Sequence, residues 1–331
     1  MLIRKALDQD IPAIIQLMRD SLGESLIPKS ERLWRWKHED NPFGESFVLV
    51  AEEDGMLIGL RAFMQWQWRR NNEVFKAVRA VDTGTHKNHQ GKGIFKKLTL
   101  QQVEECRQQG VHFVFNTPNE NSRPGYLKMG WVEQGRMPIK IKIRRPVNMA
   151  MAKLTNRKLQ GGASDPTPRQ EWNFSQMPLS LLQSYKQPET AKFETPLSEA
   201  YIKWRYADCP LYNYNYLSNG KDYLLICRIK EQAIGRELRL VDLLVFGDNR
   251  KAANEMKKEA AQYCSRNKID FISISGTTYE QYKNLLSWMG PLPVTKSGPI
   301  VTLRDLNMGD AFASMTDVSK WDFSVGAMEL F

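Results

Sequence analysis

Cysteine is scarce in this chain, and its few copies lie far apart. The 331 residues include 4 cysteines, and no two of them form a C-x-x-C pair. Isolated cysteines indicate neither a disulfide framework nor a cysteine-rich zinc site. We therefore expect no metal in this protein. The cysteines are Cys106, Cys209, Cys227 and Cys264.

Long hydrophobic runs are also missing. The sequence has no apolar stretch of about 18 residues, so it predicts no transmembrane helix. The N-terminus has no long apolar core either, and Asp8 follows soon after the start, so we expect no signal peptide. Together these absences predict a cytoplasmic protein without a membrane span.

Basic residues outnumber acidic ones and give the chain a net charge of +10. Such an excess improves solubility, and it also suits an anionic cofactor or substrate. No basic run interleaved with aromatic residues forms a nucleic-acid motif, so nucleic acid is the least favoured partner. A chain of 331 residues is long enough for two domains with separate cores.

Residues 81–98 are the most informative stretch. They predict the end of a strand, a short glycine turn and the start of a helix. Gly91 and Gly93 let the backbone turn tightly and approach a ligand closely. Free N–H groups at the start of a helix, with the positive end of its dipole, form an anion site, and nearby lysines add positive charge. The stretch therefore predicts a bound phosphate or diphosphate.

The turn fits one known signature and not two others. The dinucleotide fingerprint fails because Lys96 stands where its third glycine belongs, and the P-loop pattern is absent. Residues 90–95 match Q-x-x-G-x-G/A, the acyl-CoA signature of the GCN5-related N-acetyltransferases (GNAT), with Phe95 at the position of the final Gly or Ala. Residues 119–131 resemble the family's later motif, an Asn followed by a Tyr, a Gly and an aromatic residue. The chain thus resembles this family over residues 1–144.

The resemblance implies where an acyl-CoA binds. In the family, two central strands diverge, and the pantetheine arm lies between them and pairs with the first strand. The diphosphate sits on the glycine turn, and the later motif contacts the pantetheine or the adenosine end. The cofactor-binding residues implied for acetyl-CoA as co-substrate are Thr83, Thr85, Gln90, Gly91, Lys92, Gly93, Ile94, Phe95, Asn119 and Ser122.

Two residues are candidates for the chemistry of acetyl transfer. The reaction needs a donor that polarises the thioester carbonyl, a base for the incoming ammonium and an acid for the leaving thiolate. Tyr126 matches the tyrosine that often protonates the thiolate in the resembled family, and a phenol keeps its proton at neutral pH. Asp82 is the candidate base, because it is a carboxylate on the strand before the turn. Its structural alternative is a buried carboxylate paired with Arg79 or Arg61.

Short motifs recur in the same order along the chain, which indicates an internal duplication. The second copy has only one glycine in its strand-to-helix turn at residues 246–250, and Leu286 stands in the place of Tyr126. We therefore expect a degenerate second domain that does not bind acyl-CoA. The recurring pairs are Trp36-Lys37-His38 with Trp204-Arg205-Tyr206, Val81-Asp82 with Val241-Asp242, and Met129-Gly130 with Met289-Gly290.

Local signals predict N-caps at Asp8 and Ser30 for the first two helices and a hairpin turn at residues 53–55. They also predict that the main helix begins at Gln90 or Gly91 and that residues 139–143 form the last strand of the first domain. The order of strands and helices agrees with the acetyltransferase fold. We predict an α/β (α+β) chain with two tandem GNAT-like folds, each a mixed central sheet flanked by helices. The expected parts are a domain with the acetyl-CoA site at 1–144, a linker at 145–173, a degenerate GNAT-like domain at 174–306 and a C-terminal tail at 307–331. Trp321 in the tail is expected to pack on a domain surface.

Three functions remain open. The leading one is an acetyl-CoA-dependent N-acetyltransferase in which the amine of a small-molecule acceptor attacks the thioester directly. The second is an aminoacyl-tRNA-dependent transferase of the peptidoglycan-bridge type, which the positive charge favours and the intact glycine turn disfavours. The third is a non-catalytic CoA-binding scaffold. The acceptor is open among amino sugars, nucleotide-linked sugars, polyamines, peptide amines and hydroxyls, and so are the acyl chain length and the oligomeric state.

Overall fold

Local sequence signals build the hairpin at the centre of the first sheet. Asp54 and Gly55 have φ angles of 52° and 77°, which suit a two-residue turn between β2 (Phe47–Glu53) and β3 (Met56–Arg70). Strand β4 (Glu73–Thr85) follows and pairs antiparallel with β3. The computed structural model describes the whole chain except residues 23–27, 156–178, 186, 188, 247–249 and 329–331.

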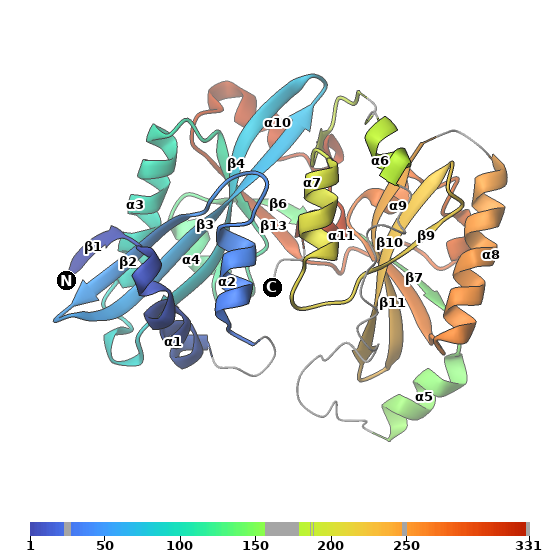
Figure 1. Cartoon of the computed structure of the whole chain (residues 1–331), viewed down its shortest axis with the longest axis horizontal. Coiled ribbons are helices and arrows are strands. Elements are labelled where there is room, and N and C mark those ends of the chain that lie inside the picture. Colours follow the sequence, from blue (N-terminus) through green and yellow to red (C-terminus); the bar gives the residue numbers. More distant parts are fainter. Residues whose placement is uncertain (23–27, 156–178, 186, 188, 247–249, 329–331) are drawn as a thin grey trace. The chain divides into compact units, whose positions relative to one another are not determined.

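The described chain divides into two units, and each has its own sheet with helices against it (Figure 1). This confirms the α/β class and the pair of sheets that a tandem fold requires. The units are not continuous segments, and the domain boundaries expected from the sequence stay a prediction. Unit 1 comprises Met1–Gly135, Glu189–Pro196 and Pro299–Trp321, and unit 2 comprises Arg136–Pro188, Leu197–Gly298 and Asp322–Phe331.

Unit 1 contains a mixed sheet. Its other strands are β1 (Leu2–Lys5), β5 (Phe113–Asn116), β6 (Val132–Arg136), β8 (Phe193–Glu194), β13 (Ile300–Asp305) and β14 (Trp321–Asp322). The main order is β1-β2-β3-β4-β5-β13-β6, and β8 joins β3 and β14 at the side. Neighbours are antiparallel from β1 to β4, whereas β4 and β5 run parallel.

Helices cover both faces of this sheet. Successive residues of a strand point to opposite faces. On β2, Val50 packs with helix α1 (Ile11–Leu22), whereas Leu49 and Ala51 pack with helix α3 (Ile94–Gln108). The two helices therefore lie on opposite sides of the sheet, as Figure 1 shows.

Shorter helices complete unit 1. They are α2 (Glu31–His38), α4 (Arg123–Lys128) and α10 (Phe312–Met315). Helix α2 begins at Ser30, whose Oγ accepts a hydrogen bond from the Leu33 backbone N–H at 3.2 Å. This confirms the N-cap predicted at Ser30. Asp8 was the expected cap of the first helix, but the carboxylate that accepts a backbone N–H there, from Leu7, is Asp10.

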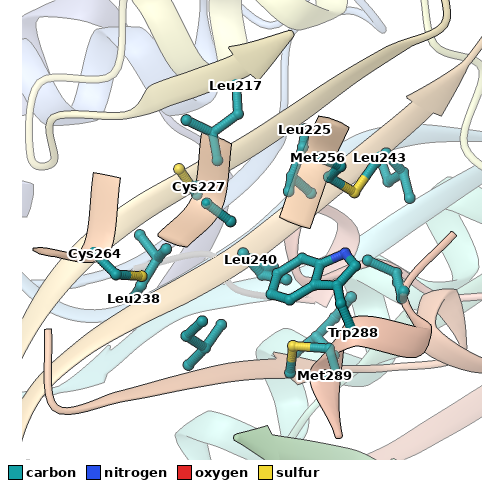
Figure 2. Close-up of a cluster of buried hydrophobic side chains, with 14 of the residues drawn as sticks. Leu217, Leu225, Cys227, Leu238, Leu240, Leu243, Met256, Cys264, Trp288 and Met289 are labelled. Atoms are coloured by element: carbon teal, nitrogen blue, oxygen red, sulfur yellow. The ribbon is translucent and has the colours of Figure 1, made fainter. Parts of the chain in front are cut away.

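Unit 2 has a similar plan. Its sheet has the order β7-β12-β11-β10-β9, with β11 and β12 parallel, as β4 and β5 are in unit 1. Helix α8 (Arg250–Arg266) packs Met256 and Cys264 into the core shown in Figure 2. The residues before it, 247–249 of the predicted turn, lie outside the described part of the chain. The strands are β7 (Ile139–Ile143), β9 (Asn215–Ser218), β10 (Tyr223–Gln232), β11 (Gly235–Val245) and β12 (Phe271–Ser275). The shorter helices are α5 (Pro146–Leu154), α6 (Leu179–Ser184), α7 (Glu199–Ile202), α9 (Thr278–Gln281) and α11 (Val325–Met328), and a π-helical turn, η4 (Lys203–Ala207), follows α7.

Each sheet contains a strand from the other half of the sequence. Strand β7 pairs antiparallel with β12, and strand β13 pairs antiparallel with β5. The Lys140 and Lys142 ammonium groups on β7 donate to backbone carbonyls of Gly290 and Trp288, at 2.8 Å for Lys140. We expected β7 to be the last strand of the first domain. Its alternation of Ile and Lys predicts a strand but carries no information about which sheet receives it.

The expected linker and tail contain ordered elements. Helix α5 lies within the expected linker 145–173, and residues 156–173 of that linker are outside the described residues. Trp321 of the tail is buried in unit 1, where its ring stacks on Phe193 with centroids 4.6 Å apart. Its indole N–H donates to the Met315 carbonyl at 2.7 Å. No helix in the described part of the chain is both long and apolar enough to cross a membrane.

We predict that Trp321→Ala lowers the free energy of unfolding by about 3–5 kcal/mol, because it removes a fully buried aromatic side chain and its hydrogen bond. Urea titration followed by circular dichroism measures this loss. Leu2→Ala is the control, since Leu2 is 60% exposed, and it should change stability by less than about 0.5 kcal/mol. Equal small effects of the two substitutions would contradict the packing of the tail.

Candidate active site

Strands β4 and β5 diverge and leave a cavity in unit 1. Their parallel pairing covers residues 77–79 and 113–115, after which β4 continues to Thr85 and β5 ends at Asn116. A cavity of about 880 Å³ opens beside the free edge of β4. The residues expected at the site that line it are Thr83, Thr85, Gln90, Gly91, Gly93, Ile94, Phe95, Asn119, Ser122 and Tyr126. Lys92 and Asp82 are not part of this lining.

The glycine turn forms one end of the cavity. Gly91 and Gly93 both have φ of 76°, in the left-handed region, and helix α3 therefore begins at Ile94, later than the predicted start at Gln90 or Gly91. The first helical bond runs from the Lys97 N–H to the Gly93 carbonyl, so the N–H groups of residues 94–96 precede it. A Cβ at either glycine would meet no atom within 4 Å. Open space, N–H groups at the helix start and the helix dipole are together suited to binding a phosphate.

The segment after β5 forms the other wall. The Asn119 side-chain oxygen accepts hydrogen bonds from the Ser122 backbone N–H at 2.9 Å and from its hydroxyl at 3.0 Å. These bonds shape the turn that leads into α4. Asn116 and Thr117 also line the cavity, and so does Ser21 of α1. The sequence prediction missed these three residues, although Asn116 ends the strand that borders the site and Thr117 directly follows it.

Tyr126 of α4 is 4% exposed and faces this cavity. Its ring makes edge-on contacts with Phe95, whose centroid lies 5.7 Å away, and a tilted contact with Trp131 at 5.1 Å. Phe95, at the position where the family signature has Gly or Ala, therefore packs against the candidate acid. Within the described part of the chain, the Tyr126 hydroxyl makes no hydrogen bond, so it is available to a ligand.

Asp82 is buried against helix α2. The Lys37 ammonium and the His38 Nε2 atom each lie 2.9 Å from its Oδ2 atom. Since a carboxylate only accepts, His38 donates from Nε2, and its Nδ1 lies 2.8 Å from the Ser46 hydroxyl. Burial alone would raise the pKa of Asp82, but the Lys37 charge and the His38 hydrogen bond outweigh burial and hold the pKa well below its usual range. Asp82 is thus a paired carboxylate, with Lys37 and His38 in place of the predicted Arg79 or Arg61.

The second copy repeats this arrangement with other residues. Tyr206 follows Arg205 as His38 follows Lys37, and the Tyr206 hydroxyl donates to Asp242 on β11. The Arg205 guanidinium is fully buried and donates to the Tyr214 hydroxyl at 3.0 Å and to the Gly326 carbonyl at 3.1 Å. Burial raises the pKa of Asp242 to about 7. The recurring motif therefore joins the helical segment to the strand in both copies.

Unit 2 differs from unit 1 beyond this shared feature. The segment that contains Phe323 and α11 lies between strand β11 and the end of β12. The Thr277 backbone N–H donates to the Phe323 carbonyl at 2.9 Å, and a Cβ at Gly326 would collide with Asp242. Leu286, in the place of Tyr126, is fully buried in the core of unit 2. The space between the diverging strands β11 and β12 is thus filled by a segment of the chain itself.

Other ionisable groups near the cavity have structural contacts. His89 lines the cavity, and its Nε2 lies 3.2 Å from Glu53. The His86 side chain accepts a hydrogen bond from the Asn88 backbone N–H at 3.3 Å. Among the residues that the structure describes, no group of three or more His, Cys, Asp or Glu side chains is arranged to hold a metal ion.

We predict that Asp82→Asn lowers the free energy of unfolding at pH 7 by about 3–5 kcal/mol, because it leaves the Lys37 ammonium buried without a counter-charge. The pKa of Asp82 is lowered in the folded state, so its stabilisation is complete above the ordinary carboxyl pKa and is lost as the pH falls below it. The difference in free energy of unfolding between wild type and variant, measured by urea titration, should therefore become smaller below about pH 4. Glu120→Gln, at an exposed carboxylate, is the control, and a pH-independent gap would contradict the pairing.

Comparison with known proteins identifies the first part of the chain. Residues 2–133 match the model of the acetyltransferase (GNAT) domain. The L-amino acid N-acyltransferase MnaT of Escherichia coli is 31% identical over 94 residues, which cover 28% of this chain and 53% of that protein. The L-methionine sulfoximine/L-methionine sulfone acetyltransferase of Salmonella typhimurium is 28% identical over 111 residues, 32% of this chain and 63% of that protein. The chain thus spans less than two thirds of both relatives.

Solved structures extend the likeness of fold to most of the chain. A GCN5-related N-acetyltransferase from Anabaena variabilis matches 93% of this chain and 73% of its own with a TM-score of 0.62 and 13% identity. A probable N-acyltransferase from Enterococcus faecalis matches the same shares with a TM-score of 0.57 and 10% identity. Residues 2–133 are therefore similar to the acetyltransferase (GNAT) domain, and these solved structures extend the likeness of fold to nearly the whole chain.

Proposed function

We propose that the protein is an N-acetyltransferase that takes acetyl-CoA into the cavity beside β4 and transfers the acetyl group to the amine of a small molecule. The main support for this proposal is that two features lie in the same cavity. The glycine turn before α3 offers free N–H groups at one end, and the Tyr126 hydroxyl faces the same space. An anionic, elongated thioester matches both features.

The glycine turn before α3 suits the diphosphate of CoA. The N–H groups of residues 94–96 and the dipole of α3 would bind it, and the side chains of Lys92 and Lys96 are exposed there. Gln90, Gly91 and Gly93 let the backbone approach the phosphates. Asn119 and Ser122 on the other wall would then meet the pantetheine or the adenosine.

The free edge of β4 suits the pantetheine arm. Thr83 and Thr85 pair with Arg61 and Gly59 of β3 on one side, and on the other side β5 has already diverged. Backbone N–H and C=O groups on that edge would pair with the amides of pantetheine as another strand would. A backbone N–H that reaches the thioester carbonyl would stabilise the oxyanion formed by the attack of the amine.

Tyr126 would act as the acid. The amine attacks the carbonyl carbon, the C–S bond breaks, and the hydroxyl proton moves to the leaving sulfur. For Asp82 we propose a positioning role in place of the base that the sequence suggested. Its paired carboxylate has a lowered pKa and therefore a weak affinity for a proton. The base is then solvent or a group brought by the acceptor.

The acceptor proposed here is a small primary amine. The two curated relatives are named for an L-amino acid and for methionine derivatives, and amino sugars remain the candidates raised by the sequence. A screen should therefore begin with L-amino acids, L-methionine sulfone and glucosamine. A cytoplasmic location is part of the proposal, since the enzyme must meet acetyl-CoA.

We predict that calorimetric titration with acetyl-CoA gives a micromolar Kd for the wild type and for Gly93→Asn, and no measurable binding for Gly93→Asp. Asn and Asp have the same size and both tolerate the left-handed conformation of Gly93. They differ in charge, and a carboxylate at this position repels the diphosphate. Equal binding by both variants would contradict phosphate binding at the glycine turn. A wild type that does not bind acetyl-CoA would overturn the proposed function.

We predict that Tyr126→Phe lowers kcat about 100-fold, within the usual contribution of a general acid, and leaves the Kd for acetyl-CoA within about twofold. Release of free thiol with the best amine of the screen measures the rate. Leu127→Ala, at a neighbouring residue that is 39% exposed, is the control and should keep wild-type kinetics. Binding without turnover by the wild type with every amine would identify a CoA-binding scaffold instead of an enzyme.

A further inference from the structure

Arg61 on β3 is the most unusual buried cation of unit 1. Its side chain is 0% exposed, and its Nε, Nη1 and Nη2 atoms have no hydrogen-bond partner among the described residues. Lys37, in the same unit, has the Asp82 carboxylate at 2.9 Å. Burying an ion without a counter-charge is costly, so a guanidinium is retained in such a place only when something offsets the cost.

Three aromatic rings surround the Arg61 guanidinium. Its central carbon lies 4.7 Å from the centroid of Phe63, 5.7 Å from that of Phe95 and 5.4 Å from that of Tyr126. The negative faces of aromatic rings attract a cation and offset part of its desolvation. Of these three rings, Phe95 and Tyr126 line the acyl-CoA cavity. The charge of Arg61 therefore lies directly behind the candidate acid.

Cys106 on α3 does not supply the missing negative charge. The Arg61 charge favours a thiolate there, but burial dominates and raises the pKa of Cys106 to about 12. The thiol is therefore neutral at physiological pH. Among the groups in contact with the guanidinium, the one that becomes negative during acetyl transfer is the Tyr126 phenol.

We propose that Arg61 is a positioning residue for acetyl transfer, whose charge stabilises the Tyr126 phenolate after Tyr126 has given its proton to the leaving thiolate. As the amine nitrogen bonds to the carbonyl carbon, the C–S bond breaks and its electron pair goes to sulfur. The Tyr126 O–H proton moves to that sulfur, and the proton released by the nitrogen goes to solvent. Solvent then returns a proton to the phenolate. The ion pair of Arg61 and Tyr126 exists only during the reaction, so it favours the transition state over the bound substrate.

This inference rests on the proposed function for its effect on the rate. With the amine substrate in hand, kcat of Arg61→Met should fall about tenfold or more. The direction follows from charge, since a nearby cation eases loss of the phenol proton and its removal opposes that loss. Arg61→Lys keeps the charge and should retain kcat within about threefold, and the Kd for acetyl-CoA should stay within about twofold in both variants.

A double-mutant cycle separates this role from a structural one. In a Tyr126→Phe background, Arg61→Met should lower the remaining rate less than about twofold, because no phenolate forms. An equal fall in both backgrounds would overturn the proposal. Arg61→Gln is the second neutral variant if Arg61→Met does not fold.

The two proposals fail in different ways. An unchanged kcat of Arg61→Met with the amine substrate would overturn the role of Arg61 and leave the acetyltransferase proposal intact. Failure of the wild type to bind acetyl-CoA would overturn the acetyltransferase proposal itself.

Discussion

The buried carboxylate of Asp82 holds strand β4 to helix α2, and the cavity depends on this contact. Beyond residue 79 the strand loses its pairing with β5, so one of its edges is free. Lys37 and His38 secure the same stretch from the side of α2 through Asp82. A strand edge that is fixed in place yet unpaired can bind an extended ligand without first paying an ordering cost.

Unit 2 contains a similar contact between a helical segment and a strand, which supports the positioning role proposed for Asp82. Asp242 keeps the position of Asp82, although its partner is now the Tyr206 hydroxyl and burial raises its pKa to about 7. The same copy has Leu286 in place of Tyr126 and its own chain between the diverging strands. Unit 2 therefore has the helix-to-strand connection, with a leucine in the position of the proposed acid.

Local signals predicted much of the fold and of the candidate site. The N-cap at Ser30, the hairpin turn at residues 53–55 and the glycine turn at residues 90–93 depend on neighbouring residues, and the structure contains each of them. The partners of Asp82 lie 44 and 45 residues away in the chain. In the sequence, the recurrence of Trp-Lys-His as Trp-Arg-Tyr is the signal for these partners, whereas the predicted structural alternative paired Asp82 with Arg79 or Arg61. Arg61 has no local signal in the sequence, because its burial without a hydrogen-bond partner among the described residues depends on tertiary packing.

We propose that one of the two similar folds binds acetyl-CoA, in the cavity beside β4. The most direct test is the number of acetyl-CoA molecules bound per chain at saturation, counted by native mass spectrometry of the full-length protein. We predict one molecule per chain. Binding of two molecules would contradict the conclusion that the chain itself fills the space between β11 and β12 in unit 2. Binding of no molecule would contradict the acyl-CoA site in unit 1.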